Sequence, residues 1–96
     1  MLHARYTRCV HVPHRTGSVI DTDEAILAAF ETHPRPPRAS TALWQARRGG
    51  HHFMWCIWDG ETFTGEMMIS EHACLQRIPQ LAIERGTTDV AVATIE

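Results

Sequence analysis

An apolar run that ends in a turn dipeptide constrains the fold of this chain more than any other feature. Residues His51–Trp58 have the composition of a β-strand, and the following Asp59-Gly60 is a strong signal for a tight hairpin turn. Residues Glu61–Ser70 predict the return strand, in which Gly65 marks a bulge. The sequence therefore predicts a β-hairpin in the second half of the chain.

The first strand of this hairpin is apolar on both faces. Side chains alternate between the two faces along a strand. The two predicted faces carry Phe53, Trp55 and Ile57, and Met54, Cys56 and Trp58. Two short helices cover only one face of a sheet, so we expect the other apolar face to be left for a partner. Met67 and Met68 on the return strand add to this surface, and methionine with tryptophan suits adaptable contacts.

Three further strands are predicted outside the hairpin. Leu2–Val12 alternates apolar and polar residues with a period of two. Thr41–Arg47 is a strand candidate that leads through the turn Arg48-Gly49-Gly50 into the hairpin. Val90–Ile95 is apolar on both faces, which is typical of a strand inside a sheet.

Two helices are predicted from their capping signals. Asp21 begins the first in a capping-box pattern, and that helix ends before Pro34. Ser70 is the predicted N-cap of the second, and Gly86 is its C-terminal stop. Pro79 is expected to break or kink this second helix.

The predicted element order is β-α-β-β-β-α-β over a single domain, residues 1–96. We expect an α+β fold with an antiparallel or mixed sheet of about five strands and two helices packed on one face. The α-β-β-β-α part resembles the layout of double-stranded RNA-binding domains. Where those domains place a lysine cluster, at the start of the second helix, this chain reads Ser70–Cys74 and is acidic. The resemblance is one of layout and implies no shared function.

Composition places the chain among cytoplasmic globular proteins. Its 96 residues are 44% hydrophobic and 21% charged, which is typical of a folded domain. The longest apolar run, Phe53–Trp58, is far shorter than the roughly 20 residues of a membrane helix. The N-terminus lacks the apolar core of a signal peptide. Three cysteines at irregular spacing do not form a disulfide framework, as expected in the cytoplasm.

The basic side chains are all arginine, and they are unevenly distributed. Residues 1–50 carry a net charge of +3 and residues 51–96 a net charge of −5, which gives the whole chain −2. Each arginine can make bidentate or stacked contacts. If the two halves stay apart in space, the molecule has a basic side and an acidic side and docks in one orientation on a charged partner. If the halves interleave, the charges average out.

Histidines and cysteines raise the hypothesis of a metal-binding or thiol enzyme. The local groups are Cys9-x-His11-x-x-His14, His51-His52 and His72-x-Cys74. None has the spacing of a zinc motif. Cys74 would lie in the first helical turn, where the helix dipole lowers the pKa of a thiol, but His72 would not face it. We therefore expect no metal, no cofactor and no catalytic residue.

The main hypothesis is a small non-enzymatic protein-binding module that regulates or inhibits a larger macromolecular complex. One concrete form is a phage- or mobile-element-encoded inhibitor of a host defence such as a CRISPR effector, and a homodimer is a further use of the same surface. The predicted partner-binding residues form an apolar face rimmed by arginines, namely Met54, Trp58, Met67, Met68, Arg35, Arg38, Arg47 and Arg48.

The alternative hypothesis is a nucleic-acid-binding accessory protein. The same four arginines lie near Trp44, Phe53 and Trp55, and arginines beside strand aromatics are the ingredients of single-strand binding. The net charge of −2 and a sequence pI of about 6.4 disfavour this function, because nucleic-acid-binding proteins usually carry a basic excess.

Overall fold

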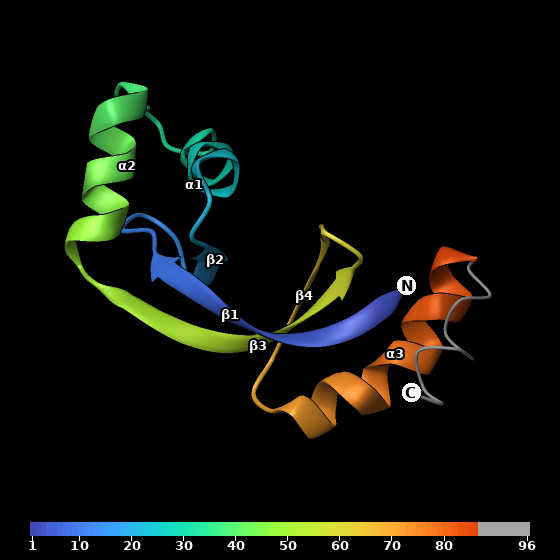
Figure 1. Ribbon diagram of the computed structural model, residues 1–96. Coiled ribbons are helices and arrows are strands. Elements are labelled where there is room, and N and C mark those ends of the chain that lie inside the picture. Colours follow the sequence, from blue (N-terminus) through green and yellow to red (C-terminus); the bar gives the residue numbers. More distant parts are fainter. Residues whose placement is uncertain (87–96) are drawn as a thin grey trace. The chain divides into compact units, whose positions relative to one another are not determined.

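The computed structural model describes residues 1–86 and shows an α+β fold (Figure 1). Its elements, in chain order, are β1 (Leu2–His11), β2 (Ser18–Ile20), α1 (Asp23–Phe30), α2 (Ala39–Arg48), β3 (His51–Asp59), β4 (Thr62–Met68) and α3 (Glu71–Arg85). None of these helices is both long enough and apolar enough to cross a bilayer.

The strands form one antiparallel sheet in the order β2-β1-β3-β4. Strand β2 pairs with the end of β1, where Val10 lies opposite Val19. The expectation of about five strands is wrong for the described residues, which contain four. The predicted strand Val90–Ile95 lies outside the residues that the structure describes.

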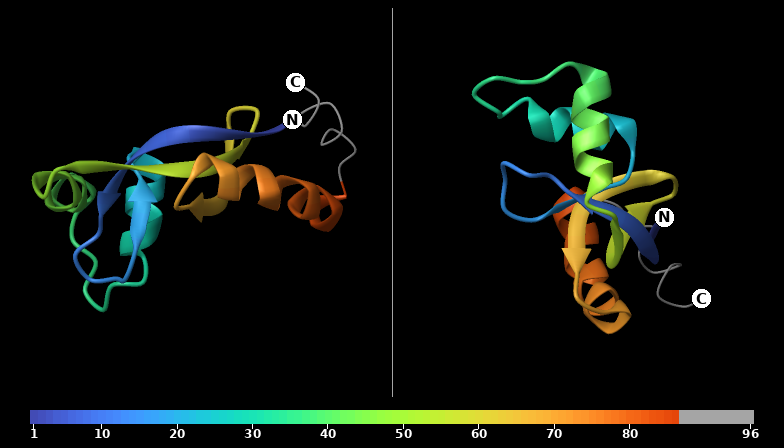
Figure 2. Two further views of the ribbon diagram at one scale, coloured as in Figure 1. Left: turned by 90° about the horizontal axis from the view of Figure 1, so that it is seen from below. Right: turned by 90° about the vertical axis from the view of Figure 1, so that its left-hand side faces the viewer.

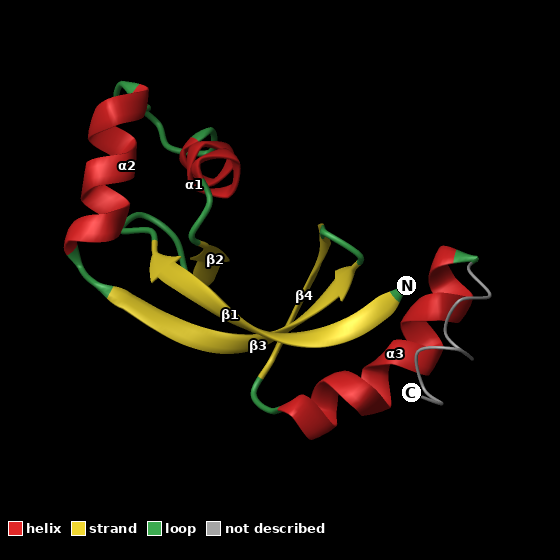
Figure 3. Ribbon diagram, in the orientation of Figure 1, coloured by secondary structure: helices red, strands yellow, loops and turns green. Residues whose placement is uncertain are grey.

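The described residues form three helices where two were expected, because the predicted strand Thr41–Arg47 is part of helix α2 (Figure 3). The stretch is rich in alanine, leucine, glutamine and arginine, which are good helix formers. Ala42 and Ala46 are both buried, and their spacing of four residues places them on one side of a helix. The helix-forming composition and the packing of Ala42 and Ala46 in the core therefore both favour a helix in this segment.

The described chain divides into two compact units, which share strands β1 and β3. Unit 1 contains Met1–Thr7 together with the chain from Met54 onward, and unit 2 is Arg8–Phe53. Unit 1 therefore holds β4 and α3, whereas unit 2 holds β2, α1 and α2.

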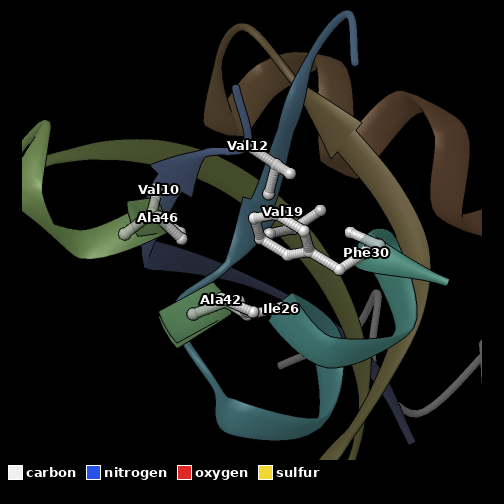
Figure 4. Packing of buried hydrophobic residues seen from close by; sticks show 8 residues of the cluster. Val10, Val12, Val19, Ile26, Phe30, Ala42 and Ala46 are labelled. Atoms are coloured by element: carbon white, nitrogen blue, oxygen red, sulfur yellow. The ribbon is translucent and has the colours of Figure 1, made fainter. Parts of the chain in front are cut away.

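The core of unit 2 lies between its two helices and the paired ends of β1 and β2. Helix α1 buries Ile26, Ala29 and Phe30 on one side, and each of the larger two contributes about 2 kcal/mol through burial. The axes of α1 and α2 cross, as the views of Figure 1 and Figure 2 show together. Figure 4 shows the apolar cluster, whose buried members are Val10, Val12, Val19, Ile26, Ala29, Phe30, Ala42 and Ala46.

The core of unit 1 forms where α3 packs on the sheet. Helix α3 buries Cys74, Ile78, Leu81 and Ala82, which recur at the spacing of one helical face. These side chains meet Leu2 of β1 and Ile57 of β3, and the partly buried Ala4, Trp55 and Met68 surround them. Alternation along β3 thus directs Ile57 towards α3 and Trp58 to the opposite side.

The caps of α3 are those predicted from the sequence, whereas the N-cap of α1 differs from the predicted one. The Ser70 hydroxyl accepts a hydrogen bond from the Ala73 amide, and Gly86 ends the helix in the left-handed conformation at φ 68°, both as predicted. Helix α3 continues through Pro79. The predicted N-cap Asp21 is wrong, since Thr22 caps α1 by accepting from the Ala25 amide.

The predicted bulge at Gly65 is confirmed. The register of β3 and β4 shifts between Cys56 and Trp58, and Gly65 adopts φ 93° on the opposite strand. The Thr64 hydroxyl donates to the Ile57 carbonyl at 2.6 Å. Phe63 pairs with Trp58 and Met67 with Cys56, so Phe63 and Met67 both lie on the same side of the hairpin as Trp58.

A candidate binding face on helix α2

Two of the four apolar residues predicted to bind a partner pack against other side chains of unit 1. Trp58 is only 9% exposed, and its Nε1 donates to the Thr7 hydroxyl at 2.9 Å. The Arg5 guanidinium lies over its indole ring, with Cζ 4.6 Å from the centroid, and the Phe63 ring lies 5.5 Å away. Met68 packs against the core cluster of unit 1 but stays half-buried. Unit 1 itself thus covers Trp58.

The other two, Met54 and Met67, are half-buried. They belong to unit 1, whereas the four predicted arginines belong to unit 2. The eight predicted residues are therefore divided between the two units, with the four apolar residues in unit 1 and the four arginines in unit 2.

Arg47 is held by an internal carboxylate. The Asp21 side chain is only 3% exposed and accepts from Arg47 Nε at 2.7 Å and from Arg8 Nε and Nη2 at 2.9 and 2.6 Å. His51 Nε2 lies 2.9 Å from the same carboxylate, and Arg47 also donates to Asp23 at 2.8 Å. Arg47 therefore joins α2 to the start of α1 through two ion pairs.

The protonation of Asp21 follows from this arrangement. Burial acts to raise the pKa of the Asp21 carboxyl, but hydrogen bonds from Arg47 and Arg8 outweigh burial and hold the pKa below its ordinary value of 3.8. The carboxylate is therefore charged at neutral pH and fixes β1, α1 and α2 within unit 2.

The exposed side of α2 carries a tryptophan on which an arginine is stacked. Trp44 is 61% exposed, and the Arg48 Cζ lies 5.0 Å from the centroid of its ring. Arg38 is the N-cap residue of the helix and is also exposed. Helix α2 contains no acidic residue. We call the surface made by Arg38, Trp44, Gln45 and Arg48 the α2 face.

A surface pocket opens beside the α2 face. It has a volume of about 600 Å³ and lies entirely within unit 2. Gln45 and Arg48 of α2 line it together with Gly49, and His11 and Pro13 complete the wall. Arg48 thus belongs both to the tryptophan stack and to the pocket, which makes these two features one candidate site.

The predicted charge division follows the two units. Unit 2 carries six arginines and four carboxylates, a net charge of +2, and the remainder of the chain carries −4. Within residues 1–86, four exposed arginines have no carboxylate partner, namely Arg15, Arg35, Arg38 and Arg48. All four lie in unit 2, so the unpaired cationic charge is concentrated there.

The histidines take part in local contacts. His14 Nε2 lies 3.1 Å from the Ala29 carbonyl, and its ring contacts Phe30 and His33. His52 Nε2 lies 2.6 Å from the Ser18 hydroxyl. Across the part of the chain that the structure describes, no three histidine, cysteine or acidic side chains lie close enough together to hold a metal ion.

The expectation of a lowered pKa at Cys74 is wrong. Burial raises the pKa of this thiol, and the neighbouring Cys56 and Glu71 raise it further. Cys74 is fully buried in the core of unit 1, where desolvation outweighs the dipole of α3. Cys74 therefore acts as a small apolar core residue.

Trp44 was named from the sequence only as an aromatic of the alternative, nucleic-acid-binding function and was not among the predicted partner-binding residues. With Thr41–Arg47 predicted as a strand, the exposed position of the indole could not be recognised. Helical spacing from the buried Ala42 and Ala46 would have placed Trp44 on the opposite, solvent-facing side of α2. No family model, curated protein or solved structure matches the chain.

Proposed function

We propose that the protein is a small non-enzymatic binding module that regulates or inhibits a larger macromolecular complex by docking on a protein partner. An inhibitor of a host-defence effector is one form of such a module. The observation that carries this proposal is the stack of Arg48 on the 61% exposed Trp44, beside a pocket of about 600 Å³. The docking surface is the α2 face.

Tryptophan and arginine at such a position support binding. These two residue types dominate the energetics of protein interfaces, where a few central side chains account for most of the affinity. The stacked guanidinium and indole restrict each other before a partner arrives, so less conformational entropy is lost on association. Trp44 is not part of the buried cluster of unit 2 and contributes little to the fold. Its large apolar surface therefore remains accessible to a partner.

Capture from the native host tests this function. Wild-type protein is compared with a Trp44→Ala/Arg48→Ala variant, and bound proteins are quantified by mass spectrometry. The expected result is a partner retained by the wild type and lost, by about tenfold or more, from the variant. Circular dichroism shows that both proteins are folded before capture.

A matched control addresses the exposed apolar residues of unit 1. Leu75 and Ile83 on α3 are 48% and 72% exposed, and a Leu75→Ala/Ile83→Ala variant removes a similar amount of apolar surface. This control is expected to retain the partner. If the control loses the partner and the α2 variant keeps it, the α2 face is the wrong surface.

Nucleic-acid binding is the second candidate, because an exposed tryptophan beside unpaired arginines also suits base stacking and phosphate contacts. The net charge of −2 opposes it. A mobility-shift assay with single-stranded DNA at low and physiological salt distinguishes the two functions. Arginine–phosphate binding has to weaken steeply as salt rises, and a tight, salt-sensitive shift that depends on Trp44 would favour the second candidate.

A further inference from the structure

Among residues 1–86, each unit contains an arginine–tryptophan pair, and in unit 1 a carboxylate also contacts the arginine. There the Arg5 guanidinium lies over Trp58, with Cζ 4.6 Å from the ring centroid. Its Nη2 also donates to the Glu61 carboxylate at 3.2 Å. The three side chains form one assembly, in which the indole supports the face of the guanidinium and a carboxylate takes a hydrogen bond from its edge.

The pair in unit 2 lacks the third member. Arg48 lies over Trp44 with Cζ 5.0 Å from the ring centroid, and no carboxylate of residues 1–86 pairs with it. A guanidinium that is stacked through its face still has N–H donors in its plane, which match a carboxylate bidentately. Trp44 therefore orients the Arg48 guanidinium, whose N–H donors have no carboxylate acceptor within residues 1–86.

The surroundings of Arg48 suit an acidic side chain. The adjoining pocket is lined by Gln45 and His11, which offer further hydrogen-bonding groups, and by Pro13 and Gly49, which leave space. At about 600 Å³ it is large enough for a side chain with part of its flanking backbone. Arg38 at the N-cap of α2 is a second exposed cation of the same face.

We infer that the α2 face takes an acidic segment of a protein partner, with one aspartate or glutamate carboxylate bound by Arg48 at the pocket. A further carboxylate of that segment meets Arg38, the other exposed arginine of the α2 face. This inference rests on the proposed function and names the chemistry of its partner. It also assigns Trp44 a positioning role, because the indole orients the guanidinium that makes the contact.

Charge favours a protein segment over a nucleic acid as the occupant. A nucleic-acid strand carries one charge on every phosphate, and the whole chain, at −2, repels an extended polyanion. An acidic protein segment needs only a few carboxylates close to the arginines of unit 2, which carries a net charge of +2. The Arg5–Glu61 contact shows that this chain already pairs a stacked arginine with a carboxylate.

Fluorescence anisotropy with defined probes tests the inference. The probes are a fluorescein-labelled oligoglutamate peptide, an oligoglutamine peptide of equal length and an oligothymidylate of equal charge. We expect the glutamate peptide to bind, the glutamine peptide not to bind, and the oligothymidylate to bind more weakly than the glutamate peptide. Tighter binding of the oligothymidylate, or no binding of the glutamate peptide at low salt, overturns the inference.

Three variants distinguish a specific contact at Arg48 from a general effect of net charge on peptide binding. Arg48→Gln is expected to weaken binding of the glutamate peptide about tenfold, whereas Arg48→Lys, which keeps the charge and loses the bidentate edge, weakens it less. Arg85→Gln makes the same change of charge in unit 1, where Arg85 is only weakly paired with Asp59 at 3.4 Å. Equal losses for Arg85→Gln and Arg48→Gln would overturn the inference.

The two proposals fail in different experiments. If host capture yields a partner that the Trp44→Ala/Arg48→Ala variant loses and the glutamate peptide does not bind, the acidic-segment inference fails and the proposed function stands. If the peptide binds through Arg48 and capture yields no partner that this double variant loses, the proposed function fails. All variants at Arg48 and Arg85 alter exposed side chains, and circular dichroism verifies their fold.

Discussion

The Asp21 carboxylate accepts a hydrogen bond from the Nε of Arg47, which lies 26 residues later in the chain, at 2.7 Å. The contact joins the loop that leads into α1 to the last turn of α2. Arg8 and His51 converge on the same carboxylate from β1 and β3. A single buried anion thus connects most of the elements of unit 2.

Loss of this anion should destabilise unit 2. Asp21→Asn keeps the size of the side chain but removes the charge that Arg8 and Arg47 share. We expect a loss of about 2 kcal/mol in the free energy of unfolding, because charge-assisted hydrogen bonds to a buried carboxylate are lost. Urea denaturation followed by circular dichroism measures the change.

Asp23→Asn is the matched control for Asp21→Asn. The Asp23 side chain is 59% exposed and makes a single contact with Arg47, so its replacement should cost less than about 1 kcal/mol. Equal losses for the two variants would show that burial of Asp21 does not decide the effect.

Stability should fall in acid, and Asp21 should account for part of the fall. Its folded-state pKa lies below 3.8, so the unfolded chain binds the proton more readily than the folded chain does. The stabilisation is complete above the unfolded pKa and is lost as the pH falls through the folded pKa. The urea midpoint should therefore drop between about pH 5 and pH 3. Asp21→Asn should flatten this dependence, and an unchanged slope would contradict the assignment.

Asp59 should add to the same acid sensitivity from unit 1. A hydrogen bond from the N-terminal amino group lowers the pKa of its carboxyl, against the opposing effect of desolvation, and Arg85 lowers it further. Part of the acid sensitivity should therefore remain in the Asp21→Asn variant.

All three cysteines should resist modification in the folded protein. Cys9, Cys56 and Cys74 are buried, none is in a disulfide, and burial raises the pKa of the Cys74 thiol. Ellman's reagent at pH 8 should react slowly with the native protein and should titrate three thiols at once after denaturation. A fast native reaction at any one cysteine would reopen the hypothesis of a thiol enzyme.

Replacement of Gly65 should be costly because of its backbone conformation alone. Its φ is 93°, and a Cβ at this position would meet no atom within 4 Å. Gly65→Ala should therefore destabilise the protein by about 1 kcal/mol through strain at the bulge. Gly49 has equal space but φ −78°, so Gly49→Ala should be neutral or slightly stabilising. Thermal unfolding of both variants compares them directly.

The sequence revealed the parts of the fold that depend on local signals. The hairpin at Gly60, the bulge at Gly65 and the caps Ser70 and Gly86 each depend on a few adjacent residues, and each was recognised. Helix α2 was interpreted as a strand, although its residues are good helix formers and Ala42 and Ala46 have helical spacing. Burial of these two alanines against α1, which the sequence does not state, favours the helix.

The candidate site was predicted only in part, for the same reason. Arg38 and Arg48 were singled out, but the exposure of Trp44 depends on α2 being a helix. The role of Arg47 depends on Asp21, which was interpreted as a helix cap. Surface chemistry that arises from contacts distant in sequence is not visible until the fold is known.

The three tryptophans lie in three different environments, and this makes the protein its own optical probe. Trp58 is buried, Trp55 is half-buried and Trp44 is 61% exposed. Of these indoles, Trp44 is the most exposed, so we expect it to be quenched most by iodide and to emit at the longest wavelength. Subtracting the spectrum of a Trp44→Phe variant isolates this signal, so occupancy of the α2 face can be followed in solution without attaching any label to the molecule.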